Sequence, residues 1–87
     1  MRVTNITNTN GNKVPNQFII ESEEGIFFQS YKSIIVKISK GKVYLDLRYW
    51  NYSKTTSKYR NIFLGETKKE TKRKIKTGEY QLVDLNK

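Results

Sequence analysis

Basic residues are concentrated between residues 68 and 76, where six of nine positions carry a positive charge. They are Lys68, Lys69, Lys72, Arg73, Lys74 and Lys76, and Ile75 is the one clearly apolar residue among them. On an α-helix, with about 100° between residues, all of these cations except Lys74 fall within an arc of about 140°, and Thr71 and Ile75 lie on an adjacent side. Like charges one helical turn apart repel by a few tenths of a kcal/mol per pair, and phosphate groups would relieve that repulsion. The spacing therefore predicts an exposed basic face that binds a polyanion.

This basic region extends toward the N-terminus through Lys54, Lys58 and Arg60, which we expect to lengthen the track of phosphate contacts. The whole chain has 17 Lys and Arg against 8 Asp and Glu, for a net charge of +9. Lysine predominates over arginine, so the pattern favours phosphate contacts of low sequence specificity over bidentate recognition of base edges. The alternative interpretation, that lysines on helix surfaces simply keep a small protein in solution, stays open.

Three aromatic rings and a cation are gathered in residues 48–52 (RYWNY). Rings beside cations can stack on unpaired bases, at about 1–3 kcal/mol per base, so Tyr49, Trp50 and Tyr52 are candidate contact residues. A chain of 87 residues also needs large side chains for its core, and Trp50 is its single tryptophan. We therefore favour core packing for Trp50. For Tyr49 and Tyr52, burial and exposure are equally compatible with the sequence. Two further tyrosines expected in the sheet would enlarge an aromatic surface, Tyr31 and Tyr44.

The residue types that are absent exclude most enzymatic chemistry. The chain has no Cys and no His, so it lacks thiolate nucleophiles, disulfides, and the commonest general base and transition-metal ligand. Its eight carboxylates show no spacing that would assemble a metal site or an acid/base pair, and we interpret them as solvated surface or capping residues. The phosphate-loop signature G-x-x-x-x-G-K-[ST] is also absent. We expect a binding protein that is not an enzyme and has no catalytic residue, metal or cofactor.

The alternation of apolar residues predicts a single α+β domain over residues 1–87 with a mainly antiparallel sheet. A short strand is expected at 2–6, and two hairpins pair 17–22 with 26–31 and 33–39 with 42–47. Residues 7–16 are rich in Asn and Thr and include Pro15, so we expect a flexible loop there. A final strand at 79–85 is expected to rejoin the sheet.

Two short helices are expected between residues 54 and 77, where the apolar spacing becomes helical. Ser53 is a capping residue for a helix over about 54–64, and Gly65 would end it. Thr67 and Glu70 have the spacing of a capping box, and the second helix should end before Gly78. Three side chains of the first helix are expected on one side, toward the core: Tyr59, Ile62 and Phe63.

Residues 49–86, and especially YWNYSKTTSKYRNIFLGET followed by KIKTGEYQLVDLN, resemble a family of small uncharacterised proteins encoded by phages and mobile elements of low-GC bacteria. The resemblance covers less than half of the chain and implies no residue roles. It implies a context, because phage proteins of this size commonly bind nucleic acid, or block a host enzyme or a defence complex such as a CRISPR nuclease. No apolar run has the length of a membrane span or of a signal-peptide core, so we expect a soluble protein in the cytoplasm of a bacterial host.

Two functional hypotheses remain. In the first, the protein binds DNA or RNA through phosphate contacts of the basic helix face, with the aromatic residues stacking on bases. In the second, it is an anti-defence or host-takeover inhibitor, for example an anti-CRISPR protein, which docks the same basic and aromatic surface on an acidic protein or ribonucleoprotein complex. Neither hypothesis needs a membrane or a metal.

Overall fold

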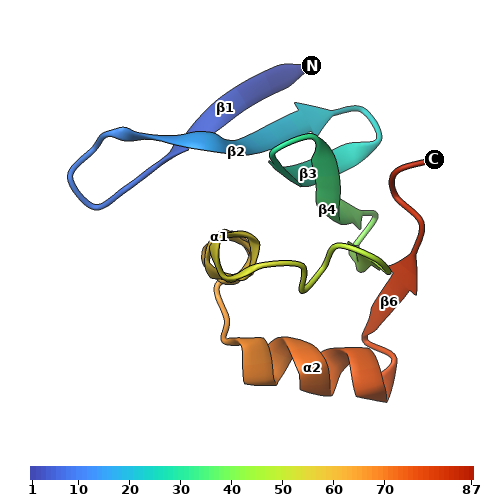
Figure 1. Cartoon of the computed structure of the whole chain (residues 1–87). Helices are drawn as coiled ribbons and strands as arrows, with labels where there is room; N and C mark the ends of the chain where they lie inside the picture. Colours follow the sequence, from blue (N-terminus) through green and yellow to red (C-terminus); the bar gives the residue numbers. More distant parts are fainter.

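The computed structural model describes all residues, 1–87. It contains one six-stranded sheet, whose strands are ordered as in the chain, and two helices (Figure 1). The strands are β1 (Arg2–Thr7), β2 (Lys13–Ser22), β3 (Gly25–Ser30), β4 (Ser33–Ser39), β5 (Lys42–Asp46) and β6 (Tyr80–Val83), and the helices are α1 (Lys54–Leu64) and α2 (Lys68–Thr77). The prediction of an α+β fold with a mainly antiparallel sheet is confirmed.

Strands β1 to β5 form an antiparallel meander, and β6 pairs in parallel with β5. A parallel neighbour requires a crossover connection, which α1 and α2 provide between Asp46 and Tyr80. Both predicted hairpins are present. Gly25, the first residue of β3, has a φ of +143°, and a Cβ atom there would lie 2.2 Å from the carbonyl oxygen of Ile38. Only glycine fits this position.

The expected loop over residues 7–16 is wrong in extent, because β2 begins at Lys13 and leaves residues 8–12 as the turn. In this turn the Asn8 side-chain oxygen accepts hydrogen bonds from the backbone N–H groups of Asn10 and Asn12, at 2.9 and 3.0 Å. Pro15 is tolerated in β2 because pairing with β3 begins only at Gln17, so no ladder hydrogen bond is lost on that side.

A long-range contact holds the irregular start of β2 against β1. The Asn5 side-chain nitrogen donates to the carbonyl oxygens of Val14 and Gln17, at 2.6 and 3.0 Å. The register of β1 against β2 shifts between Asn5 and Thr7 at the same place. A side chain of β1 therefore satisfies carbonyl groups that the regular ladder leaves free, which composition alone does not reveal.

Both helix predictions are confirmed with their caps. Ser53 accepts a hydrogen bond from the backbone N–H of Thr56 at 3.1 Å, and Gly65 ends α1 with a φ of +69°. Thr67 and Glu70 form the predicted capping box at the start of α2, which ends at Gly78. Neither helix has the length and the apolar character that a transmembrane helix needs.

The core lies between the sheet and α1, which contacts β3 and lies below the sheet in Figure 1. Phe28 of β3 is fully buried, and its ring stacks on Phe63 of α1 with the centroids 5.7 Å apart. Ile62, which was expected toward the core, is 58% exposed. It lies about 100° around the helix from Phe63, on the same outward side as Lys58.

Candidate nucleic-acid interface

Helix α2 presents the basic face that the sequence predicts. Its inward side is fixed, because Thr71 is fully buried and Ile75 packs against the core cluster. Five cations are exposed on the other side: Lys68, Lys69, Lys72, Arg73 and Lys76. The helix is held along one edge and turns these charges toward solvent.

Lys74, the sixth basic residue of α2, forms an ion pair within the protein. Its Nζ lies 2.8 Å from Oε1 of Glu66, whose side chain is only 3% exposed. Glu66 also accepts hydrogen bonds from the hydroxyl groups of Thr71 and Tyr80, at 2.5 and 2.6 Å. Burial by itself would raise the pKa of Glu66, but the hydrogen bonds from Lys74, Thr71 and Tyr80 hold it below its ordinary value. The interpretation of Glu66 as a solvated or capping carboxylate is wrong, since it ties α2 to β6.

Arg60 does not belong to the exposed track that the sequence analysis assigned to it. Its side chain is fully buried, with the guanidinium carbon 5.2 Å from the centre of the Trp50 ring. Nη1 donates to the carbonyl oxygen of Trp50, and Nη2 donates to Oδ1 of Asn61 at 2.9 Å. Burial lowers the pKa of Arg60, and the charge of Glu66 offsets part of that effect. Position 60 lies on the inward side of α1, where the guanidinium has aromatic and carbonyl partners.

Lys54 and Lys58 lie one turn apart on the outward side of α1 and are both exposed. They line an open depression together with Lys68, the first residue of α2. Tyr52 and Ile62 lie on its rim. The basic surface is therefore continuous from the first turn of α1 to α2. We call this surface the basic track and define it by Lys54, Lys58, Lys68, Lys69, Lys72, Arg73 and Lys76.

The protein's own carboxylates leave most of the basic track uncompensated. The structure has two ion pairs, Lys74 with Glu66 and Arg73 with Glu79, the latter at 3.7 Å on the surface. None of the six lysines of the basic track has a carboxylate oxygen within 4.0 Å. Unpaired surface cations of one sign produce a field that attracts anions from solution.

The three aromatic candidates have different environments. Trp50 is half-buried against the core and covered by Arg60, so it serves packing. Tyr52 is 71% exposed, and Tyr49 is half-buried. The rings of Tyr49 and Tyr52 meet edge to face with their centroids 5.5 Å apart and their planes at 72°. Of the three candidates, only the two tyrosines can reach a ligand.

A second open depression adjoins the basic track at Tyr52. Its walls include Tyr31 and Lys32 from the β3–β4 turn and Tyr49 and Tyr52 from the β5–α1 connection, and we call it the tyrosine depression. Tyr31 is 52% exposed. Lys32 was not among the predicted site residues. Its position in the two-residue turn between Ser30 and Ser33 could have indicated an exposed side chain, because a turn residue has no neighbouring strand to pack against.

Asp46 fixes the connection that carries Tyr49. It is 1% exposed, and its carboxylate accepts hydrogen bonds from the backbone N–H groups of Arg48, Tyr49 and Leu85, at 3.0, 2.9 and 2.9 Å. Burial by itself would raise the pKa of Asp46, but the hydrogen bonds from Leu85, Asn86, Tyr49 and Arg48 hold it below its ordinary value. The interpretation of Asp46 as a solvated carboxylate is therefore wrong.

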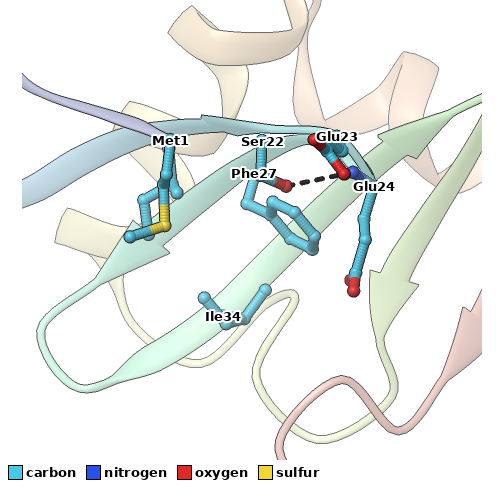
Figure 2. A pocket seen from close by; sticks show the side chains of 7 residues that line it. Met1, Ser22, Glu23, Glu24, Phe27 and Ile34 are labelled. Atoms are coloured by element: carbon cyan, nitrogen blue, oxygen red, sulfur yellow. Dashed lines mark hydrogen bonds between the residues drawn. The ribbon is translucent and has the colours of Figure 1, made fainter.

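The opposite face of the sheet has a different character. A pocket there is lined by Met1, Phe27 and Ile34 and is bordered by Glu23 and Glu24 (Figure 2). The charges at this pocket are mixed, because Nζ of Lys37 lies 5.7 Å from the centre of the Phe27 ring. No group of three or more carboxylate, Cys or His side chains is placed to hold a metal ion. The surface suited to a polyanion is on the side of the helices.

The family model that matches the chain is described as a family of unknown function (DUF8033) and covers residues 1–79. No curated protein and no solved structure matches the chain.

Proposed function

We propose that this chain, which belongs to the family of unknown function DUF8033, binds nucleic acid through its basic track without catalysing a reaction. Lysine ammonium groups would contact phosphates of the backbone, and affinity would depend weakly on base sequence. The proposal covers DNA and RNA, because both present the same phosphate charge.

The observation that carries the proposal is the set of six lysines without a carboxylate partner. Four of them lie on α2, and Lys54 and Lys58 continue the surface on α1. Like charges held this close repel one another, and a phosphate backbone with regularly spaced charges relieves that repulsion along its length. Two other cations of this region have partners within the fold: Lys74 pairs with Glu66, and Arg60 donates to the carbonyl oxygen of Trp50.

The test is fluorescence anisotropy with labelled single- and double-stranded DNA and RNA over a range of salt concentrations. If all six lysines engage phosphates of duplex DNA, the logarithm of the association constant should fall with the logarithm of salt concentration at a slope of about −5. The triple charge reversal Lys69→Glu, Lys72→Glu and Lys76→Glu should abolish binding to every sequence.

A matched control reverses the same number of charges away from the helices, at Lys13, Lys40 and Lys87, which are also exposed. This control should bind less tightly only because the net charge of the protein is lower. It should keep most of the dependence of affinity on salt concentration. Equal losses in the two triple variants would mean that overall charge and not the basic track attracts the ligand. Full binding by the α2 variant would refute the proposal.

A second candidate function is inhibition of a host or defence complex, such as a CRISPR nuclease, by the same surface. Two exposed apolar side chains next to Lys54 and Lys58 favour it: Tyr52, 71% exposed, and Ile62, 58% exposed. Aromatic anchors surrounded by charge are typical of protein interfaces. In affinity measurements on a captured acidic partner, Tyr52→Ala should then weaken binding more than any single lysine variant. Diffuse lysine effects without an aromatic anchor would contradict this function.

A further inference from the structure

The tyrosine depression brings together rings that are distant in the sequence. Tyr31 comes from the turn between β3 and β4, whereas Tyr49 and Tyr52 come from the connection between β5 and α1. Ile35 lines the same depression, and the hydroxyl groups of Ser30 and Thr56, which are 3.0 Å apart, also belong to its lining. An apolar and aromatic hollow with a few polar groups suits a flat heterocycle.

Tyr31 has the positive φ that a two-residue hairpin turn requires at its first position, although an aromatic residue adopts it poorly. Its φ is +58°, a left-handed conformation that is unfavourable for an aromatic residue and easy for glycine or asparagine. The ring is 52% exposed, so core burial does not compensate for the strain. Strained residues that persist without a packing role occur preferentially at binding sites.

A second lining residue of the depression, Asn16, also has a left-handed backbone, which asparagine adopts readily. Asn16 has a φ of +65°, and its carbonyl oxygen accepts a hydrogen bond from the backbone N–H of Tyr31 at 2.7 Å. Gln29 holds the other side of the turn, because its side-chain nitrogen donates to the carbonyl oxygen of Tyr31 at 2.8 Å. Two neighbouring segments thus fix the backbone from which the exposed Tyr31 ring projects.

One buried amide near the depression has no hydrogen-bond partner. Gln17, which is paired with Ser30 across β2 and β3, is fully buried, and neither polar atom of its amide has a hydrogen-bond partner. Buried polar groups without partners are rare in folded proteins. Gln17 does not itself line the tyrosine depression, so no ligand contact is assigned to it.

The tyrosine depression is continuous with the basic track. Tyr52 lines both depressions, Lys32 stands at the rim on one side, and Lys54, Lys58 and Lys68 lie on the other. A chain of nucleotides that placed one base against the tyrosines would carry its neighbouring phosphates toward lysines on both sides. In a duplex the bases are stacked and paired, so they cannot enter such a hollow.

We infer that the preferred ligand is single-stranded nucleic acid, with an unpaired base held in the tyrosine depression by Tyr31, Tyr49 and Tyr52. This inference rests on the proposed function, since the basic track supplies the phosphate contacts on either side. Tyr31 and Tyr52 are contact residues, and Asn16 and Gln29 are positioning residues that hold the turn of Tyr31.

The experiment compares a labelled thymidine oligonucleotide of about 12 residues, the matching RNA, and a duplex of the same length by anisotropy. Wild-type protein should bind the single strands more tightly than the duplex. Tyr52→Leu and Tyr31→Asn should each weaken single-strand binding about tenfold, the loss expected for one stacked base, and leave duplex binding unchanged. Tyr44→Leu, which removes a half-buried tyrosine outside the depression, should change neither affinity.

Thermal unfolding separates the role of Tyr31 in binding from a role in folding. Because asparagine adopts the left-handed conformation readily, Tyr31→Asn should unfold at or above the wild-type temperature while it binds single strands less tightly. If the tyrosine variants weakened binding to single strands and to duplex equally, or weakened neither, the base site would be overturned. The proposal of the basic track would be unaffected. A wild-type protein that binds no nucleic acid at physiological salt would overturn the proposed function together with this inference.

Discussion

The guanidinium carbon of Arg60 lies 5.2 Å from the centre of the Trp50 ring, and Nη1 of Arg60 donates to the carbonyl oxygen of the same tryptophan. This pair joins α1 to the connection that precedes it. It also removes the only arginine of α1 from the surface, so the basic track consists almost entirely of lysines. Lysine binds phosphate as a point charge, which fits contacts that do not depend on base sequence.

The Arg60–Trp50 contact predicts a stability effect without a binding effect. Arg60→Ala should lower the free energy of unfolding by about 2–4 kcal/mol, because it removes a desolvated cation–π contact and leaves a cavity. Urea denaturation measures the loss, with Lys58→Ala as an exposed control on the same helix. If Arg60→Ala folded as stably as wild type but lost nucleic-acid affinity, Arg60 would be a ligand contact and the assignment to the core would fail.

Lys72 and Lys74 are near neighbours on α2 with opposite predicted phenotypes. Lys72→Ala should reduce the salt slope of binding to duplex DNA by about 0.9 and leave the unfolding temperature unchanged, since Lys72 is exposed and unpaired. Lys74→Ala should lower the unfolding temperature, because the buried Glu66 loses its cation, and leave the salt slope unchanged. Anisotropy measures the salt slope of both variants, and thermal denaturation measures their unfolding temperatures. The opposite result would contradict the assignment of Lys72 to binding and of Lys74 to stability.

Asp46 predicts a loss of stability in acid. Its folded-state pKa is depressed, so below the pKa of an unfolded aspartate, about 3.9, the unfolded chain binds more protons than the folded protein. The stabilisation from Asp46 is therefore complete above that value and disappears as pH falls through the lower folded-state pKa. Asp46→Asn should be less stable at neutral pH and should show a weaker dependence on pH in this window. Denaturation midpoints from pH 7 to pH 2 measure the slope, with Glu24→Gln as an exposed control, and an unchanged slope in Asp46→Asn would contradict the assignment.

Gly25 at the start of β3 and Gly41 in the turn between β4 and β5 both have positive φ, and only Gly25 is crowded. A Cβ atom at Gly25 would lie 2.2 Å from the carbonyl oxygen of Ile38, whereas a Cβ atom at Gly41 would meet nothing within 4 Å. Gly25→Ala should therefore destabilise the protein by about 3 kcal/mol or more, and Gly41→Ala by about 1 kcal/mol. Chemical denaturation of the two variants measures the difference, and equal losses would show that the β2–β3 turn shifts to make room.

Local features of the fold were predictable from the sequence because their causes lie within a few residues. The caps Ser53 and Gly65 and the capping box of Thr67 and Glu70 bound the helices where they were expected. The two predicted hairpins followed from the glycine between their strands and from apolar alternation. The face of α2 was also predictable, since helical geometry places Lys68, Lys69, Lys72, Arg73 and Lys76 together whatever the rest of the chain does.

Long-range contacts decided the remaining features. The burial of Arg60 depended on Trp50. The pairing of Lys74 depended on Glu66, in the α1–α2 connection, and on Tyr80 of β6. A lysine or arginine on a helix looks the same in the sequence whether a distant carboxylate or ring meets it or not, because the desolvation and pairing energies depend on tertiary neighbours. The sequence by itself therefore determined a basic α+β domain with a lysine-rich helix face. The tertiary structure decided which cations stay free, and it alone placed Tyr31 beside Tyr49 and Tyr52, because the β3–β4 turn and the β5–α1 connection meet only after the sheet has formed.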